Sequence, residues 1–300
     1  MRSFFTKAHR LTLLAICLVT AVGCHNDSVR TNDTDTITDD YGSIVVVPSN
    51  PKRIVSASPA ITEIIFALGG QEKLIGRTEF CTYPPEAAMV ENIGGISNLN
   101  VEKIASLHPD LVISGSMIPQ KSVQQLGTLG IPVVCVIEKK HFDGLYENIK
   151  TVGQLINRPD AADSLNIAIR TEIHDLQQTL AQDSHHPTVY YVVGYGSGGN
   201  FTAGGESFIN DIITMSGGEN IAQDIRGWSY SIEKLISNDP DYIIVRSEDS
   251  AAFCNTHPYE RLSAVRQGRV IGINSGLLDL QAPRNVGAIR FLNKRLHPIK

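Results

Sequence analysis

The longest regular pattern of apolar and polar positions lies in the middle of the chain, from residue 159 to residue 182. Apolar side chains recur there at steps of three or four residues, at Leu165, Ile169, Ile173, Leu176 and Leu180. This spacing predicts a helix with one apolar face, and the proline at position 159 suits its first turn. At 1.5 Å per residue the helix would be roughly 36 Å long, about the span of a small domain.

Shorter apolar runs alternate with amphipathic segments on both sides of this helix. Strands are predicted at 44–47, 53–56, 74–75, 111–114, 131–137, 188–193, 242–245 and 270–273. Helices are predicted between them, at 58–68, 100–107, 120–129, 143–156, 207–215, 231–237, 259–265 and 283–296. This alternation indicates mostly parallel sheets that are covered by helices on both faces.

The two halves of the chain contain a sequence repeat. Residues 100–113 (NVEKIASLHPDLVI) align with residues 231–244 (SIEKLISNDPDYII), and residues 62–70 align more weakly with residues 210–218. Two copies favour a pair of related lobes over a solenoid. The alternative is a chance likeness, because many α/β proteins contain helix–Pro-Asp–strand segments. The predicted fold is α/β, with two Rossmann-like lobes of mostly parallel sheet joined by one long rigid helix.

The first residues form a targeting signal. A basic start is followed by an apolar run at 11–19, which is too short to span a membrane, and then by Ala21-Val22-Gly23-Cys24. A small residue before a cysteine resembles the bacterial lipoprotein signal, which implies lipidation of Cys24. An ordinary secreted protein that is cleaved nearby is the alternative. We expect a protein of the cell envelope, periplasmic or extracytoplasmic, that is anchored to a membrane by lipid.

These patterns divide the chain into five parts. They are a signal peptide (1–23), a flexible tether (24–43), an N-terminal lobe (44–157), an interlobe backbone helix (158–183) and a C-terminal lobe (184–300). The tether is predicted from its polar composition and its lack of apolar periodicity. The crevice between two such lobes is the expected ligand site.

Composition and short motifs exclude several classes of function. The 300 residues carry a net charge of −5 and no basic run, which argues against a nucleic-acid partner. The histidines show no paired spacing for a metal site, and we expect no metal and no cofactor. No G-x-S-x-G nucleophile motif is present, so the sequence does not support an enzyme.

Three cysteines lie in the body of the chain. Cys135 falls in an apolar run and is predicted to be a buried small side chain. Cys81 and Cys254 are placed in loops, one in each half, and a disulfide between them would join the lobes. The sequence leaves both this bridge and free thiols open.

A glycine-rich segment follows the predicted strand at 188–193. Gly194-Tyr195-Gly196-Ser197-Gly198-Gly199 fits G-x-G-x-x-G, which in a nucleotide-binding enzyme opens directly into a helix. Here it runs into an extended segment, so a nucleotide-dependent enzyme that uses this loop is the remote alternative. We expect the glycines to let the loop approach a ligand, and we count Tyr195 among the ligand-binding candidates.

Aromatic residues are the candidate lining of the ligand site. Trp228 is the only tryptophan and lies in a predicted loop. With Phe80, Tyr83 and Tyr230 it would form an apolar wall for a large flat ligand. The alternative is that these loop aromatics pack into the lobes.

Two acidic residues, Glu102 and Glu233, occupy equivalent positions in the repeat, each two residues after a helix-capping residue. An acid in the first turn stabilises a helix without any other role. One such acid on each lobe would also offer a matched pair to a two-fold symmetric partner that carries arginines.

Several segments together carry a family resemblance: RIVSASPAITE (53–63), YPPEA (83–87), NLNVEKI (98–104), HPDLVI (108–113), LGTLGIP (126–132), FTAGGES (201–207), GGEN (217–220) and APR (282–284). Through them the chain, from residue 53 to 297, resembles the substrate-binding proteins of ABC importers for cobalamin and iron chelates. Lobes of that family are joined by one long helix. Within the family the chain is most similar to the cobalamin-binding branch.

This resemblance implies the roles of five residues. Tyr83 and Trp228 would line a corrinoid site, and Arg284 would lie near the cleft. Glu102 and Glu233 would dock the lobes onto arginines of a dimeric permease, which works with its ATPase. The resemblance therefore implies a binding protein that delivers cobalamin to a membrane permease, and we expect it to be a monomer. Because the long helix limits lobe motion, we expect only a small hinge movement between the lobes.

One departure from the family pattern bears on the ligand. The other tryptophans of the cobalamin branch's pocket are absent, and Ser116-Met117 occupies one such region. Heme or a ferric siderophore is therefore the alternative ligand for the same transport role.

Overall fold

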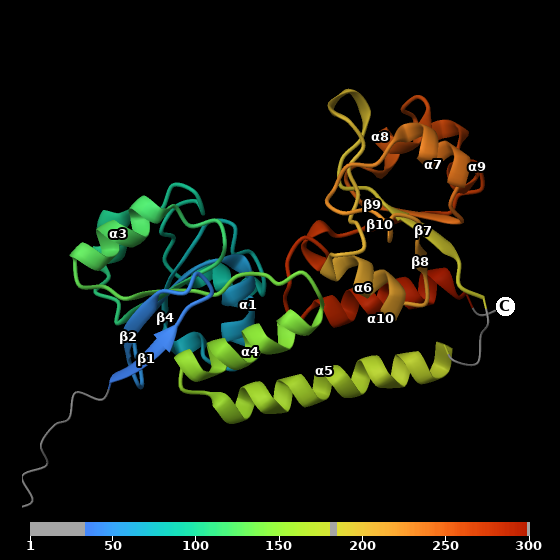
Figure 1. Cartoon of the computed structure of the whole chain (residues 1–300). Helices are drawn as coiled ribbons and strands as arrows, with labels where there is room; N and C mark the ends of the chain where they lie inside the picture. Colours follow the sequence, from blue (N-terminus) through green and yellow to red (C-terminus); the bar gives the residue numbers. More distant parts are fainter. Residues whose placement is uncertain (1–33, 181–184, 299–300) are drawn as a thin grey trace, which may run out of the picture. The chain divides into compact units, whose positions relative to one another are not determined.

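The computed structural model describes residues 34–180 and 185–298 (Figure 1). The predicted signal peptide, the lipidation site Cys24 and the first part of the tether lie outside the described residues. Within the residues that are described, no helix is both long and apolar enough to cross a membrane.

A four-stranded parallel sheet forms the centre of the N-terminal lobe. Its strands are β3 (Ile54–Ala57), β4 (Leu74–Arg77), β5 (Leu111–Ser114) and β6 (Val133–Cys135), in the order β4-β3-β5-β6. Its helices are α1 (Pro59–Ala67), α2 (Val101–Ser106), α3 (Gln120–Thr128) and α4 (Asp143–Leu155). Successive strand residues point to opposite faces, so Leu111 packs into the core that contains α1 and α4, whereas Val112 packs into the core that contains α2 and α3.

A second parallel sheet forms the C-terminal lobe. Its strands are β7 (Thr188–Tyr191), β8 (Glu219–Asn220), β9 (Tyr242–Arg246) and β10 (Val270–Ile273), in the order β10-β9-β7-β8. Its helices are α6 (Phe208–Met215), α7 (Ile232–Asn238), α8 (Ser250–Cys254), α9 (Ser263–Arg266) and α10 (Asn285–Leu296). The predicted α/β class with mostly parallel sheets is confirmed.

The repeat in the sequence corresponds to a repeat in the structure. In each sheet the first strand of the lobe lies between the second and the third, with the fourth at the edge beyond the third. Asp110 accepts hydrogen bonds from the amides of Lys52 and Arg53, just before β3, and Asp241 accepts one from the amide of Thr188 at the start of β7. The aspartate of each Pro-Asp turn thus ties the third strand to the first in both lobes.

Helix α5 (Pro159–Leu180) is the predicted long helix, and the last residues of its predicted range lie outside the described residues. Its apolar face is buried at Ala162, Ile169, Ile173 and Leu180. The helix packs on α4 of the first lobe and on α10 of the second (Figure 1). One continuous apolar core therefore runs from the first sheet, along α5, to the second.

The prediction of a flexible tether up to residue 43 is wrong for its last ten residues. Strand β1 (Thr34–Thr38) pairs in antiparallel fashion with β2 (Ile44–Pro48), so that the predicted strand at 44–47 joins this separate hairpin and not the parallel sheet. Four of the five residues of β1 are threonine or isoleucine, and their β-branched side chains favour strands even without an apolar alternation.

Smaller differences concern the second lobe. Strand β8 and helix α8 were not predicted, and the helix predicted at 259–265 consists of a short 3-10 turn at Tyr259–Arg261 followed by α9. These elements have two to five residues, too few to show a periodicity.

Candidate functional site

The predicted ligand-binding residues lie beyond the carboxyl ends of the parallel strands. Each sheet reverses its winding between its first and third strands, and α/β sheets bind ligands at the carboxyl ends of strands near such a point. Phe80 and Tyr83 follow β4, and Tyr195 follows β7. Both Phe80 and Tyr83 are exposed, the latter at 46%.

The two lobes meet at a buried ion pair next to Tyr83. Arg284, just before α10, places Nη2 2.6 Å from Oε1 of Glu63 in α1. The centre of the Arg284 guanidinium lies 4.8 Å from the centroid of the Tyr83 ring, close enough for a cation–π contact. These three residues line an interlobe pocket of about 380 Å³ together with Phe66, Ala67, Pro84 and Pro283. Tyr83 and Arg284, predicted separately, are thus brought together.

Glu63 is the most strongly perturbed acid near this pocket. Its side chain is only 3% exposed. Burial raises the pKa of Glu63 to about 7, in spite of the opposing charge of Arg284. Sequence analysis missed Glu63 as a site residue, although it closes the segment RIVSASPAITE that carries the family resemblance.

The glycine-rich loop of the second lobe supports aromatic side chains. The amide of Phe201 donates to the carbonyl of Gly194 (2.9 Å), and the amide of Thr202 donates to the carbonyl of Trp228 (2.7 Å). A side chain at Gly194 would crowd the ring of Phe201, since its Cβ would lie 3.1 Å from Cδ2. Phe201 and Trp228 therefore sit in adjacent segments, and both are exposed, Trp228 at 50%. Phe201 is a candidate that sequence analysis did not select.

This loop contradicts the nucleotide-binding interpretation. After Gly194 the chain forms a single 3-10 turn at Gly196–Gly198 and then an extended segment, not a helix with a free N-terminus. Tyr195 is half-buried, and its ring packs edge-on against Phe253 and Tyr259. Tyr195 thus contributes more to the packing of the second lobe than to the exposed rim of the site.

The predicted place of Tyr230 in the ligand wall is wrong. Tyr230 is only 3% exposed and its ring centroid lies 5.4 Å from that of Tyr190, inside the core of the second lobe. Its hydroxyl donates to the carbonyl of Ile221 and accepts from Asn238. Trp228 and Tyr230 are two positions apart and would share one face of a regular strand, so their opposite burial shows that the segment before α7 does not keep a strand's alternation.

Trp228 lines a second pocket that both lobes form. This pocket has a volume of about 370 Å³, and its lining includes Glu138, Lys139 and Lys140 from the first lobe and Phe208 and Trp228 from the second. Tyr83 does not line it, so the structure does not bring Tyr83 and Trp228 into one pocket.

A buried glutamine joins the two lobes near these pockets. Gln281 accepts a hydrogen bond from the amide of Lys139 (2.9 Å) and donates one to the carbonyl of His141 (2.8 Å). It precedes Arg284 by three residues, while Lys139 lines the Trp228 pocket. The short segment from Gln281 to Arg284 therefore reaches both pockets: Gln281 bonds to Lys139 at one, and Arg284 lines the other.

The two predicted docking acids are exposed in the first turns of α2 and α7. The caps are equivalent: Asn100 accepts from the amide of Lys103, and Ser231 accepts from the amide of Lys234. Hydrogen bonds from its own backbone amide and from Ser231 hold the pKa of Glu233 below its usual range. Both carboxylates are accessible to a partner.

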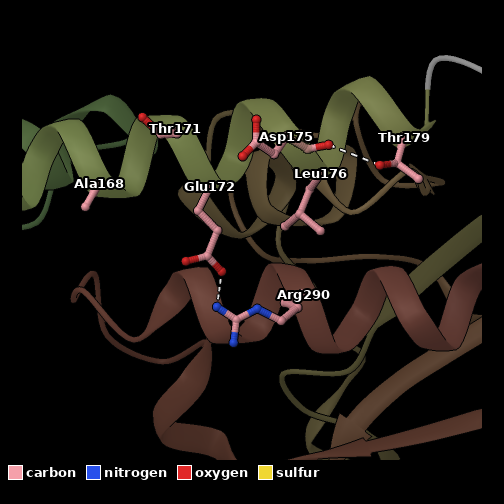
Figure 2. Close-up of a pocket in the computed structure, with 7 residues that line it drawn as sticks. All are labelled: Ala168, Thr171, Glu172, Asp175, Leu176, Thr179 and Arg290. Carbon is pink, nitrogen blue, oxygen red and sulfur yellow. Dashed lines mark hydrogen bonds and ion pairs between the residues drawn. The ribbon is translucent and has the colours of Figure 1, made fainter.

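A larger pocket lies away from all predicted site residues, between α5 and α10 (Figure 2). Glu172 of α5 points toward Arg290 of α10 and forms an ion pair with it, as Figure 2 shows. The pocket has a volume of about 510 Å³ and no aromatic side chain lines it. We interpret it as a gap in the contact between helix α5 and helix α10 of the second lobe, and not as a ligand site.

The described part of the chain contains no disulfide between its cysteines and no cluster of side chains suited to a metal ion. Cys81, Cys135 and Cys254 are free thiols, so the alternative of a Cys81–Cys254 disulfide does not hold. Cys135 is buried, as predicted. No group of three or more His, Cys, Asp or Glu side chains is placed to hold a metal ion among residues 34–180 and 185–298.

Comparisons with known proteins agree with this fold. Residues 54–277 match the family model described as periplasmic binding protein. The uncharacterized ABC transporter substrate-binding lipoprotein YvrC of Bacillus subtilis is 30% identical, over 95% of this chain and 95% of its own. A cobalamin-binding protein of Halobacterium salinarum is 28% identical, over 86% of this chain and 73% of its own.

A solved structure shows the same architecture. The periplasmic heme-binding protein RhuT from Roseiflexus sp. RS-1, in apo form, has a TM-score of 0.71 and 28% identity, over 82% of this chain and 97% of its own. These relatives are solute-binding proteins and not enzymes. The chain therefore belongs to the periplasmic binding protein family, which includes the substrate-binding proteins of ABC transporters.

Proposed function

We propose that this protein is the substrate-binding lipoprotein of an ABC importer and that it binds a corrinoid such as cobalamin between its lobes. One observation carries the proposal: large apolar side chains stand exposed beyond the strand ends of both lobes. They are Phe80, Tyr83 and Met117 in the first lobe and Phe201 and Trp228 in the second. Exposed apolar groups that gather in this way mark a binding surface, and aromatic rings suit a flat macrocycle.

The two interlobe pockets suggest how a large ligand would lie. Their volumes, about 380 and 370 Å³, are at the lower end of the range for small-molecule sites. A corrinoid would exceed either pocket alone, so it would lie across the rims of both and contact Tyr83 and Trp228 together. The name of the Halobacterium relative, a cobalamin-binding protein, supports this ligand.

Heme is the second candidate. The likeness to the heme-binding protein RhuT favours it. The half-exposed phenol of Tyr83 favours it as well, because tyrosine is one of the side chains that bind heme iron. A ferric siderophore has less support. Two of the four arginines that could bind its anionic groups (Arg77, Arg226, Arg246 and Arg284) already have close acidic partners, Arg284 with Glu63 and Arg246 with Asp279.

Delivery of the ligand would use the two exposed acids. Glu102 and Glu233 stand in equivalent first turns of the two lobes and would pair with arginines on a dimeric permease driven by its ATPase. Lipid on Cys24 would hold the protein at the membrane, and the Bacillus relative's name as a lipoprotein supports this anchor. The net charge of −5 gives no support to a nucleic-acid partner, and we expect a monomer.

Isothermal titration of the protein without residues 1–24 tests the ligand. Cyanocobalamin, hemin and a ferric siderophore would be titrated side by side, and the proposal expects saturable one-to-one binding of cyanocobalamin. Tyr83→Ala and Trp228→Ala should weaken it, whereas Ile167→Ala, an exposed apolar residue on α5, is the matched control. Binding of hemin alone would move the function to heme uptake, and no binding of any of the three would contradict the proposal.

A further inference from the structure

The segment that precedes β2 lies along the open edge of the first sheet. Strand β6 ends the order β4-β3-β5-β6, so its outer edge has no strand partner in that sheet. The amide of Asp40 donates to the carbonyl of Cys135 (3.1 Å), and the amide of Ile137 donates to Oδ2 of Asp40 (2.8 Å). Asp40 also forms an ion pair with Lys139. Residues 39–43 are therefore fixed at the carboxyl end of β6, the same end that carries the candidate site.

Tyr41 is held within this segment at the rim of that site. Its hydroxyl donates to the carbonyl of Ser116 (2.9 Å), two residues beyond the end of β5. The Ser116 hydroxyl donates in turn to Oε2 of Glu138 (3.0 Å), and Glu138 lines the pocket that contains Trp228. Tyr41 is thus connected through two hydrogen bonds to a residue of the Trp228 pocket.

The Tyr41 side chain is fixed at both ends and yet exposed. The residue is 57% exposed, although its amide donates to Oδ1 of Asp39 (3.0 Å) and its hydroxyl donates to Ser116. An exposed hydrogen bond adds little to folding stability. A ring that is already immobilised, however, loses little conformational entropy when a ligand covers it. We therefore expect the immobilised Tyr41 ring to contribute more to ligand affinity than to folding stability.

We propose that Tyr41 is a further ligand-contacting residue, whose ring adds an aromatic face to the binding surface for a planar tetrapyrrole. Residues 39–43 are the strap that positions this ring. The proposal rests on the proposed function, since a tetrapyrrole is the ligand that such a face would cover. It makes the segment that follows the lipid anchor part of the binding surface and not only a spacer.

Three variants test this assignment in the protein without residues 1–24. Tyr41→Ala removes the ring, and Tyr41→Phe keeps the ring but removes the bond to Ser116. Ile44→Ala, an exposed apolar residue of the same hairpin, is the matched control. Each would be titrated with cyanocobalamin and with hemin, and its thermal midpoint would be recorded. For whichever tetrapyrrole the parent binds, we expect Tyr41→Ala to weaken binding about three- to tenfold.

The other outcomes separate this proposal from the proposed function. Tyr41→Phe should retain most of the affinity, and Ile44→Ala should bind as tightly as the parent. The thermal midpoints of all three variants should stay close to that of the parent. Unchanged affinity in Tyr41→Ala, alongside a loss in Trp228→Ala, would overturn the role of Tyr41 and leave the proposed function standing. An equal loss in all three hairpin variants would assign the hairpin a structural role and overturn the proposal. Failure of the parent to bind either tetrapyrrole would overturn both.

Discussion

Glu63 and Arg284 form a buried ion pair that joins the two lobes, with 2.6 Å between Oε1 and Nη2. The second carboxylate oxygen of Glu63 and Nε of Arg284 are buried without a hydrogen-bond partner among the described residues. A buried pair that is only partly satisfied gains little net stability, but removal of one partner is costly. We infer that the pair fixes Arg284 beneath the Tyr83 ring and so shapes one end of the ligand site.

The pKa of Glu63 leads to a prediction about pH. Its folded value of about 7 lies above the ordinary 4.5, so the folded state holds the proton more tightly than the unfolded state. Its stabilising contribution is therefore complete below about pH 4.5 and is lost as the pH rises to about 7. Glu63→Gln lacks this titration. We expect the stability of the parent, relative to Glu63→Gln, to fall by up to about 3 kcal/mol between these limits.

Urea unfolding of both proteins at several pH values measures this difference. Glu248→Gln, a change at an exposed acid, is the matched control and should run parallel to the parent. A parent–Glu63→Gln difference that stays constant with pH would show that Arg284 keeps Glu63 charged throughout, contrary to the prediction.

Gly276 gives a second test of the same pair. A Cβ at this position would lie 2.6 Å from Nη1 of Arg284, so Gly276→Ala must displace the guanidinium from Glu63. We expect a loss of about 1–3 kcal/mol in stability, because a buried charge loses its partner, together with weaker ligand binding. Gly127→Ala is the control: nothing lies within 4 Å of its Cβ, and in helix α3 it should stabilise by up to about 1 kcal/mol. Equal effects of the two substitutions in unfolding and titration experiments would contradict this account.

Substitution of Trp228 should mainly weaken ligand binding and substitution of Tyr230 should mainly reduce stability, although only one residue lies between them. Trp228→Ala removes an exposed ring, so we expect weaker ligand binding, about three- to tenfold, with little change in stability. Tyr230→Ala removes a buried ring that packs on Tyr190 and should cost about 3–5 kcal/mol. Calorimetric titration and denaturant unfolding of both variants measure the two effects. A large loss of stability in Trp228→Ala would place its ring in the core instead.

The architecture could be predicted from the sequence because its signals are local or repeated. Helix α5 has 22 residues with an apolar stripe along most of its length, and the Pro-Asp turns recur in both lobes with equivalent hydrogen bonds. The hairpin of β1 and β2 carries no such signal. Its stabilisation comes from partners distant in the chain, such as Cys135 and Lys139, which no local pattern can indicate.

The site was predictable by residue type but not by side-chain direction. Tyr83, Trp228 and Tyr230 are all aromatic residues in loop segments, yet two are exposed and one is buried. A regular strand would place Trp228 and Tyr230 on the same face, so their opposite burial depends on the irregular backbone between them, which the sequence does not reveal. Glu63 looked like an ordinary helix residue because its partner Arg284 lies 221 positions away, which follows from their residue numbers.

The matched acids lead to a prediction about transport. Charge reversal at both positions, Glu102→Lys with Glu233→Lys, should abolish ligand uptake by cells that carry the permease, while ligand affinity in titration stays unchanged. Because Asn100 and Ser231 still cap the two helices, folding should be nearly unaffected. Glu86→Lys with Glu248→Lys, at two other exposed acids, controls for the change of net charge. Uptake that survives the reversal would reduce Glu102 and Glu233 to acids that stabilise helix starts.

The last prediction concerns lobe motion. A wide closure would have to bend α5 or separate it from α4 or α10, and the apolar core runs continuously across these contacts. Gln281 also joins the lobes near the pockets through the amide of Lys139 and the carbonyl of His141. We therefore expect the radius of gyration in small-angle scattering to change by less than about 1 Å when the ligand binds, as in other preorganised complexes. Gln281→Ala should loosen this contact and enlarge the change, with Gln178→Ala on α5 as the control. A compaction of several ångströms in the parent itself would mean that α5 acts as a hinge and not as a rigid connection.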